Sequence, residues 1–81
     1  MQTMIDESGV ALELSKAEAL VLFHFLWRYT KVDRLVIEDQ AEQRVLWDLL
    51  ATLERTLVEP FDRNFPELLQ KARDEIRDST Q

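Results

Sequence analysis

His24 is the side chain in this sequence best suited to acid–base chemistry, because an imidazole changes its charge near neutral pH. It is the single histidine of the chain and lies within an apolar stretch. A general base, a pH sensor or a ligand contact would use an imidazole in such a place. Catalysis also needs a nucleophile or an orienting group, and the sequence singles out neither. We therefore expect His24 to be a half-buried structural residue, and an enzyme or ligand-binding site around it is the alternative.

Two groups of carboxylates provide the hard oxygen ligands that divalent cations prefer. They are Glu38, Asp39 and Glu42 in the first group, and Asp74, Glu75 and Asp78 in the second. Neither group has the spacing of a calcium loop. The first coincides with an expected helix start, where carboxylates are favoured, and the second alternates with basic residues. The chain has no cysteine, which excludes thiolate sites and thiol nucleophiles. We predict no metal site, no catalytic site and no cofactor.

A basic group, Arg28, Lys31 and Arg34, lies next to two aromatic residues, Trp27 and Tyr29. Basic residues beside stacking aromatic rings are typical of surfaces that bind single-stranded nucleic acid. The whole chain, however, has a net charge of −6, which repels a phosphate backbone. Cations also stabilise the carboxyl end of a helix, which explains this group without a ligand. We expect no nucleic-acid partner, and a nucleic-acid-associated regulator that uses these three residues is a second alternative.

The clearest local signal is Ser15-Lys16-Ala17-Glu18, a capping box in which each end residue can accept a hydrogen bond from the other's backbone. It predicts a helix over residues 16–30. Two apolar stripes follow that helix: Leu20, Phe23 and Trp27 in one, and Leu22, Phe25, Leu26 and Tyr29 in the other. A helix that is apolar on most sides is buried on most sides.

Two further helices are predicted, over residues 40–58 and 66–78. Asp39 and Glu42 repeat the capping pattern at the start of the first, and Pro60 prevents its continuation. Its apolar residues are Val45, Leu46, Leu49, Leu50, Leu53 and Leu57. Pro66 suits a first helical turn in the second helix. The apolar stripe of that helix comprises Phe65, Leu68, Leu69, Ala72 and Ile76.

The amino-terminal residues alternate in polarity over 10–14, after a turn-like segment at residues 6–9 with the single glycine of the chain. Residues 10–14 are expected as a strand or extended arm. Met4 and Ile5 pair with it as a hairpin in one interpretation, and residues 35–37 pair with it in another. The predicted fold is thus mainly α, a three-helix, bundle-like single domain over residues 1–81. We expect residues 1–9 and 79–81 to be flexible.

Five large apolar residues are candidates for an interface: Leu22, Phe25, Trp27, Tyr29 and Trp47. Two partner helices with one narrow stripe each do not cover a helix with two stripes, and Trp47 falls outside the main leucine stripe of its own helix. Indole rings are enriched where proteins bind one another. These observations predict a small, non-enzymatic interaction or regulatory module that forms a homodimer and binds an unknown protein partner.

The longest apolar run falls well short of the ~20 residues that cross a bilayer. Asp6, Glu7 and Glu13 precede that run, where a secretory signal would have basic residues. The sequence predicts no membrane partner and a cytoplasmic location.

Overall fold

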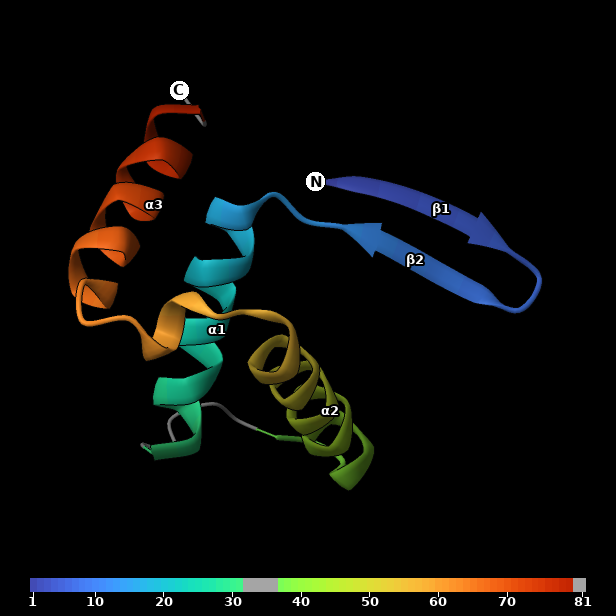
Figure 1. Ribbon diagram of the computed structural model, residues 1–81. Coiled ribbons are helices and arrows are strands. Elements are labelled where there is room, and N and C mark those ends of the chain that lie inside the picture. Colours follow the sequence, from blue (N-terminus) through green and yellow to red (C-terminus); the bar gives the residue numbers. More distant parts are fainter. Residues whose placement is uncertain (32–36, 80–81) are drawn as a thin grey trace.

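The computed structural model describes residues 1–31 and 37–79. In this part of the chain, two strands, β1 (Gln2–Asp6) and β2 (Gly9–Glu13), precede three α-helices, α1 (Lys16–Lys31), α2 (Gln40–Thr56) and α3 (Phe65–Ser79), with a 3₁₀ helix η1 (Glu59–Phe61) before α3 (Figure 1). The mainly α fold with three helices is confirmed. The flexibility expected at residues 1–9 remains a prediction, and residues 80–81 of the expected flexible carboxyl end lie outside the described residues.

Helix α1 lies between the other two helices, with α3 on one side and α2 on the other (Figure 1). The core is built around it, and Leu26 is its most deeply buried side chain, only 2% exposed. The other members of the core cluster are Ala17, Ala19, Leu20, Phe23, Leu50, Leu53, Leu57 and Ala72. Because each buried leucine side chain stabilises a fold by about 1.5–3 kcal/mol, packing on α1 holds the helices together.

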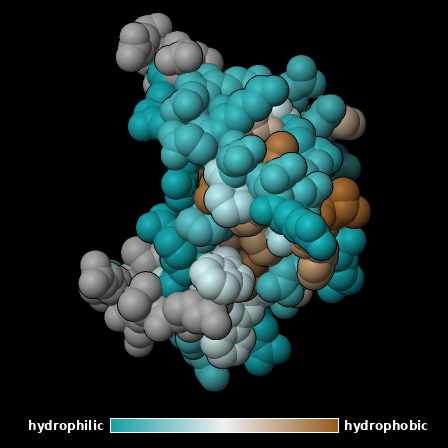
Figure 2. All heavy atoms as spheres, turned by 60° about the vertical axis from the view of Figure 1, so that its left-hand side comes forward, coloured by the Kyte–Doolittle hydropathy of each residue, from teal (hydrophilic) through white to brown (hydrophobic). Residues whose placement is uncertain are grey.

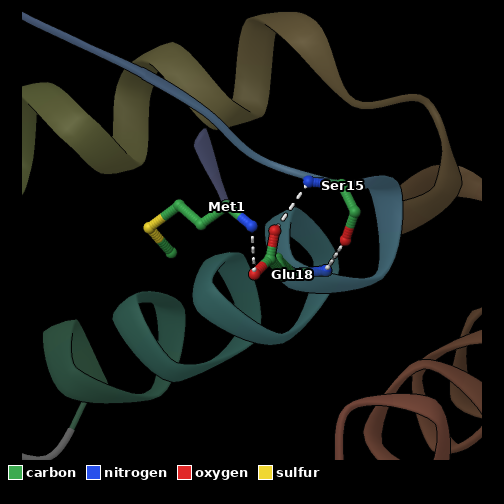
Figure 3. A network of polar contacts seen from close by, with 3 residues as sticks. All are labelled: Met1, Ser15 and Glu18. Atoms are coloured by element: carbon green, nitrogen blue, oxygen red, sulfur yellow. Dashed lines mark hydrogen bonds and ion pairs between the residues drawn. The ribbon is translucent and has the colours of Figure 1, made fainter. Parts of the chain in front are cut away.

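The predicted capping box at the start of α1 is confirmed. The Ser15 backbone N–H donates to Oε1 of Glu18 at 2.8 Å, and the Glu18 backbone N–H donates to Oγ of Ser15 at 3.1 Å (Figure 3). The other carboxylate oxygen of Glu18 accepts a hydrogen bond from the amino terminus of Met1 at 3.2 Å. One carboxylate therefore fixes both the helix start and the amino end of β1.

The second capping box is also confirmed. The Asp39 side chain accepts a hydrogen bond from the Ala41 backbone N–H at 2.7 Å, and the Glu42 side chain accepts one from the Asp39 backbone N–H. Helix α2 ends at Thr56 with Leu57 as its cap, slightly before the predicted end at residue 58. Pro60 then lies in η1, outside the α-helix, where its missing N–H would have left the carbonyl four residues earlier without a donor.

Helix α3 begins at Phe65, directly before Pro66, as the fixed backbone angle of proline favours. Leu69 and Ala72 of its predicted stripe are buried. Phe65 and Ile76 are partly buried and pack against the core cluster. Figure 2 looks onto the side of the molecule where α3 lies and shows a mostly hydrophilic surface, with apolar atoms visible in a recess.

The amino-terminal residues form a hairpin, as the first of the two interpretations of the sequence predicts. Strands β1 and β2 pair antiparallel, with Thr3 opposite Leu12 and Ile5 opposite Val10. At the turn, Oδ1 of Asp6 accepts hydrogen bonds from the backbone N–H groups of Ser8 and Gly9, at 2.8 and 3.1 Å. Residues 35 and 36 of the alternative pairing lie outside the described residues.

The hairpin extends away from the helices (Figure 1). Leu14, which follows β2, packs against the core cluster and joins the hairpin to the helical part. Over residues 1–31 and 37–79, no helix is both long and apolar enough to cross a membrane.

Candidate functional site

A groove lined mainly by aromatic rings opens where α1, the end of α2, η1 and α3 meet. Its volume is about 570 Å³, within the usual ~300–1,000 Å³ of small-molecule sites. The lining residues are Phe23, His24 and Trp27 from α1, Glu54 from α2, Pro60 and Phe61 from η1, and Phe65 from α3. Residues separated by up to 42 positions in the sequence therefore share one surface recess.

The rings on the α1 side of the groove hold one another in place. Phe23 and Phe65 meet edge to face with their centroids 6.3 Å apart. The His24 ring stacks on Trp27 with a centroid separation of 6.2 Å and an angle of 20° between the planes, and it also contacts Phe65. Aromatic pairs in such geometries contribute about 0.5–1.5 kcal/mol beyond their buried area, so this wall is largely preformed.

The imidazole of His24 is held in its neutral form. A guanidinium nitrogen of Arg73 lies 3.1 Å from Nδ1, and a guanidinium can only donate, so Nδ1 accepts and the ring proton resides on Nε2. Burial lowers the pKa of His24 below its ordinary value of 6.5, and the charges of Arg73 and Arg28 lower it further. The ring therefore offers its surroundings an uncharged donor and an aromatic face.

The Nδ1 atom of His24 is engaged by Arg73 and not by a carboxylate that would orient the ring as a general base. Among the described residues, no group of three or more His, Asp and Glu side chains is placed to hold a metal ion. The arrangement is suited to binding, through its ring faces, the His24 donor and the carboxylate of Glu54.

The hairpin is a second candidate surface. Because neighbouring side chains of a strand point to opposite faces and paired residues share a face, Thr3, Ile5, Val10 and Leu12 form one face, called here the apolar hairpin face. Ile5, Val10 and Leu12 are 81%, 63% and 60% exposed. Asp6 and Glu13 lie on the opposite face. That opposite face also carries Met4, which is 76% exposed, so the hairpin combines an uncovered apolar face with a mixed face that holds the acidic side chains.

The five residues predicted as an interface lie in different environments. Phe25, Trp27 and Trp47 are 42–51% exposed. Leu22 is partly buried and packs against the core cluster. Tyr29 is buried, and its hydroxyl has no hydrogen-bond partner among the described residues. The structure places Trp27 in the groove, whereas Trp47 is not among the residues that line it.

The predicted basic group is described only in part. The guanidinium of Arg28 lies over the ring of Phe25, 5.9 Å from its centroid, so this cation packs on its own helix. Arg34 and the side chain of Lys31 lie outside the described part of the chain. In the two acidic groups, Asp39 and Glu42 cap α2, and Asp74 forms an ion pair with Arg77. The side chain of Asp78 also lies outside the described part.

Sequence reasoning missed Phe61, Pro60 and Glu54 as lining residues of the groove. Phe61 follows Pro60 in the connection between two predicted helices. A large aromatic ring in a short polar connection is the signal that could have identified it. The sequence already indicates that a hairpin of this kind needs something to cover its apolar face, because an isolated hairpin is only marginally stable. It did not place Ile5, Val10 and Leu12 in the interface, which it assigned to residues of α1 and to Trp47.

Comparisons with known proteins found no match: no family model fits the chain, and no curated protein or solved structure is significantly similar to it. The likeness of other proteins therefore contributes nothing to the functional argument.

Proposed function

We propose that this protein is a non-enzymatic interaction module that assembles through the apolar hairpin face. The observation that carries the proposal is the exposure of Ile5, Val10 and Leu12 on one side of a hairpin that extends away from the helices. A two-stranded hairpin is marginally stable in water unless further strands or a packed helix support it. A contiguous apolar face on an otherwise polar surface usually marks a contact with another protein.

A second copy of the chain is the partner that fits this face. When two hairpins pack face to face, Ile5, Val10 and Leu12 of each copy are covered by the same residues of the other. Asp6 and Glu13 then remain on the outer faces, in water, so that the carboxylates of the two copies stay apart. A closed symmetric dimer is the commonest assembly of small proteins. The proposal is therefore a homodimer, as the sequence also predicts, with the hairpin in the interface.

The mass of the protein across a dilution series, measured by light scattering, tests the proposal. We expect a dimer that dissociates on dilution, and a monomer at all concentrations for the Ile5→Ser variant. Met4→Ser is the matched control, because Met4 is a neighbouring, exposed residue on the opposite face of the hairpin. It should leave the dimer intact.

Three results would contradict the proposal. A monomeric wild type at every concentration would exclude self-association. An equal loss of the dimer in Met4→Ser would show that the apolar hairpin face is not specifically required. Loss of the dimer in Trp47→Ala with a normal dimer in Ile5→Ser would place the interface on α2, where the sequence also suggested it.

A further inference from the structure

We propose that the aromatic groove is a binding site for a small hydrophobic organic cation, an amine or quaternary ammonium compound that carries an apolar group. This site is separate from the apolar hairpin face, and the proposal does not depend on the homodimer. The lining residues, the volume and the charge of the groove each contribute to the argument.

The walls of the groove are suited to a cation with an apolar body. Four benzene or indole rings line it, those of Phe23, Trp27, Phe61 and Phe65. The face of such a ring carries negative potential, which attracts a cation within about 6 Å of its centroid, with Trp the strongest partner. Phe61 is 82% exposed, so its ring is available to a bound molecule without any loss of core packing.

The charge of the groove selects the sign of the ligand. Glu54 is the single carboxylate among its lining residues, and His24 is neutral because Arg73 bonds to its Nδ1. Arg73 itself is not among the lining residues; its guanidinium binds the ring from the α3 side. Among the lining residues, a ligand therefore meets one negative group and several aromatic rings, while the positive charges of Arg73 and Arg28, which lower the pKa of His24, act from outside that lining. The carboxylate of Glu54 is thus the group that would select a cation over an anion.

The size of the groove favours a free small molecule over a protein segment. About 570 Å³ accommodates a ligand of modest size, and residues of α1, α2, η1 and α3 border the recess. A docked helix would instead need a long open channel. Binding by such sites depends on apolar walls with a few polar groups that fix orientation, which here are Glu54 and His24.

The two tryptophans provide the test, because Trp27 lines the groove and Trp47 does not. The indole N–H signals of both residues are followed by NMR during titration with benzyltrimethylammonium, and the variant Trp47→Phe assigns them. We expect a saturable shift at Trp27 and none at Trp47. Neopentylbenzene, the neutral compound of the same shape, and phenylacetate, an anion, are titrated in parallel and should bind more weakly than the cation.

Two variants examine the groups that carry the proposal. Glu54→Gln should weaken binding of the cation roughly two- to five-fold, as expected for one exposed charge pair, and leave binding of the neutral compound unchanged. Glu75→Gln, an exposed helical carboxylate outside the groove lining, is the matched control and should change neither. Phe61→Ala should weaken binding of the cation by a similar factor, because it removes one ring from the wall of the groove.

The proposal is overturned in three ways. A Trp27 signal that does not shift saturably would exclude a binding site in the groove. Equal or tighter binding of neopentylbenzene or phenylacetate would exclude selection of a cation. A shift of equal size at Trp47 would show that the cation associates with the protein surface in general. The folded state of each variant is monitored in the same spectra.

Discussion

The helices and the hairpin use apolar residues in opposite ways. Leu26 of α1 is almost completely buried, whereas Leu12 of β2 is mostly exposed, although both belong to segments with a clear hydrophobic pattern. The helices cover one another, and the hairpin has no covering element among the described residues. A hydrophobic pattern thus predicts which side chains need burial, but not whether the same chain provides it.

In the exposure of its side chains, the groove is intermediate between the helical core and the hairpin. Phe23 belongs to the core, whereas Phe61, which lines the same groove, is 82% exposed. The aromatic groove is thus the edge of the helical core, preformed by packing, whereas the hairpin is a surface that stands apart from it. We therefore expect the two regions to respond differently to mutation and to pH, and four predictions test that difference.

The largest effect is expected for the same substitution in the two regions. Leu26→Ala should lower the free energy of unfolding by about 2–5 kcal/mol, because it leaves a cavity in the core. Leu12→Ala should change it by less than about 0.5 kcal/mol when the protein is dilute enough to be monomeric. Urea unfolding followed by circular dichroism measures both. Similar losses in the two variants would show that the hairpin is part of the cooperative core.

A smaller effect is expected at the junction of the two regions. Ser15→Ala and Glu18→Ala each remove one hydrogen bond of the capping box, and each should cost about 0.5–2 kcal/mol of stability. The double variant should cost less than the sum of the two, because the bonds are reciprocal. Thermal or urea unfolding of the four proteins completes the cycle. Strictly additive losses would indicate that the two side chains act independently.

The response to pH should separate the regions further. The folded protein lowers the pKa of His24 below 6.5, mainly through burial, so the unfolded chain binds a proton more readily than the folded one. Stability contributed by neutral His24 is therefore complete above pH 6.5 and is lost as the pH falls through the lower folded pKa. The free energy of unfolding of the wild type should therefore decrease as the pH is lowered from 7.5 to 5. His24→Gln should show a shallower dependence, and an unchanged slope would contradict the assignment.

The smallest effect on the helices is expected from the hairpin turn. Hydrogen bonds from Ser8 and Gly9 lower the pKa of Asp6 below 3.8, so this carboxylate stays ionised throughout the range in which His24 titrates. Asp6→Ala removes those bonds and should disorder the hairpin locally, while α1 retains its stability. NMR shifts of residues 2–13, with the melting temperature as the control, test this. A large fall in melting temperature would connect the turn to the core.

Some features of the fold are predictable because their causes are local. The starts of α1 and α2 depend on Ser15 with Glu18 and on Asp39 with Glu42, pairs only three residues apart, and both capping boxes form as the sequence predicts. The stripe of α2, which is buried at Leu50 and Leu53 but not at Val45, 64% exposed, and the ending of that helix before Pro60 likewise depend on helical periodicity and on the geometry of proline.

The candidate sites depend on contacts that local patterns do not contain. His24 is identifiable in the sequence as a titratable group, but its neutral form depends on Arg73, 49 positions away, and its place in a groove depends on Glu54, Phe61 and Phe65. The side chains that line the groove come from four separate elements, and their distances follow from helix packing. The exposure of the hairpin is decided in the same way. Alternation in residues 10–14 predicts a strand with an apolar face. Only the tertiary structure decides that no helix within residues 1–31 and 37–79 covers that face, because coverage is set by where the other elements pack.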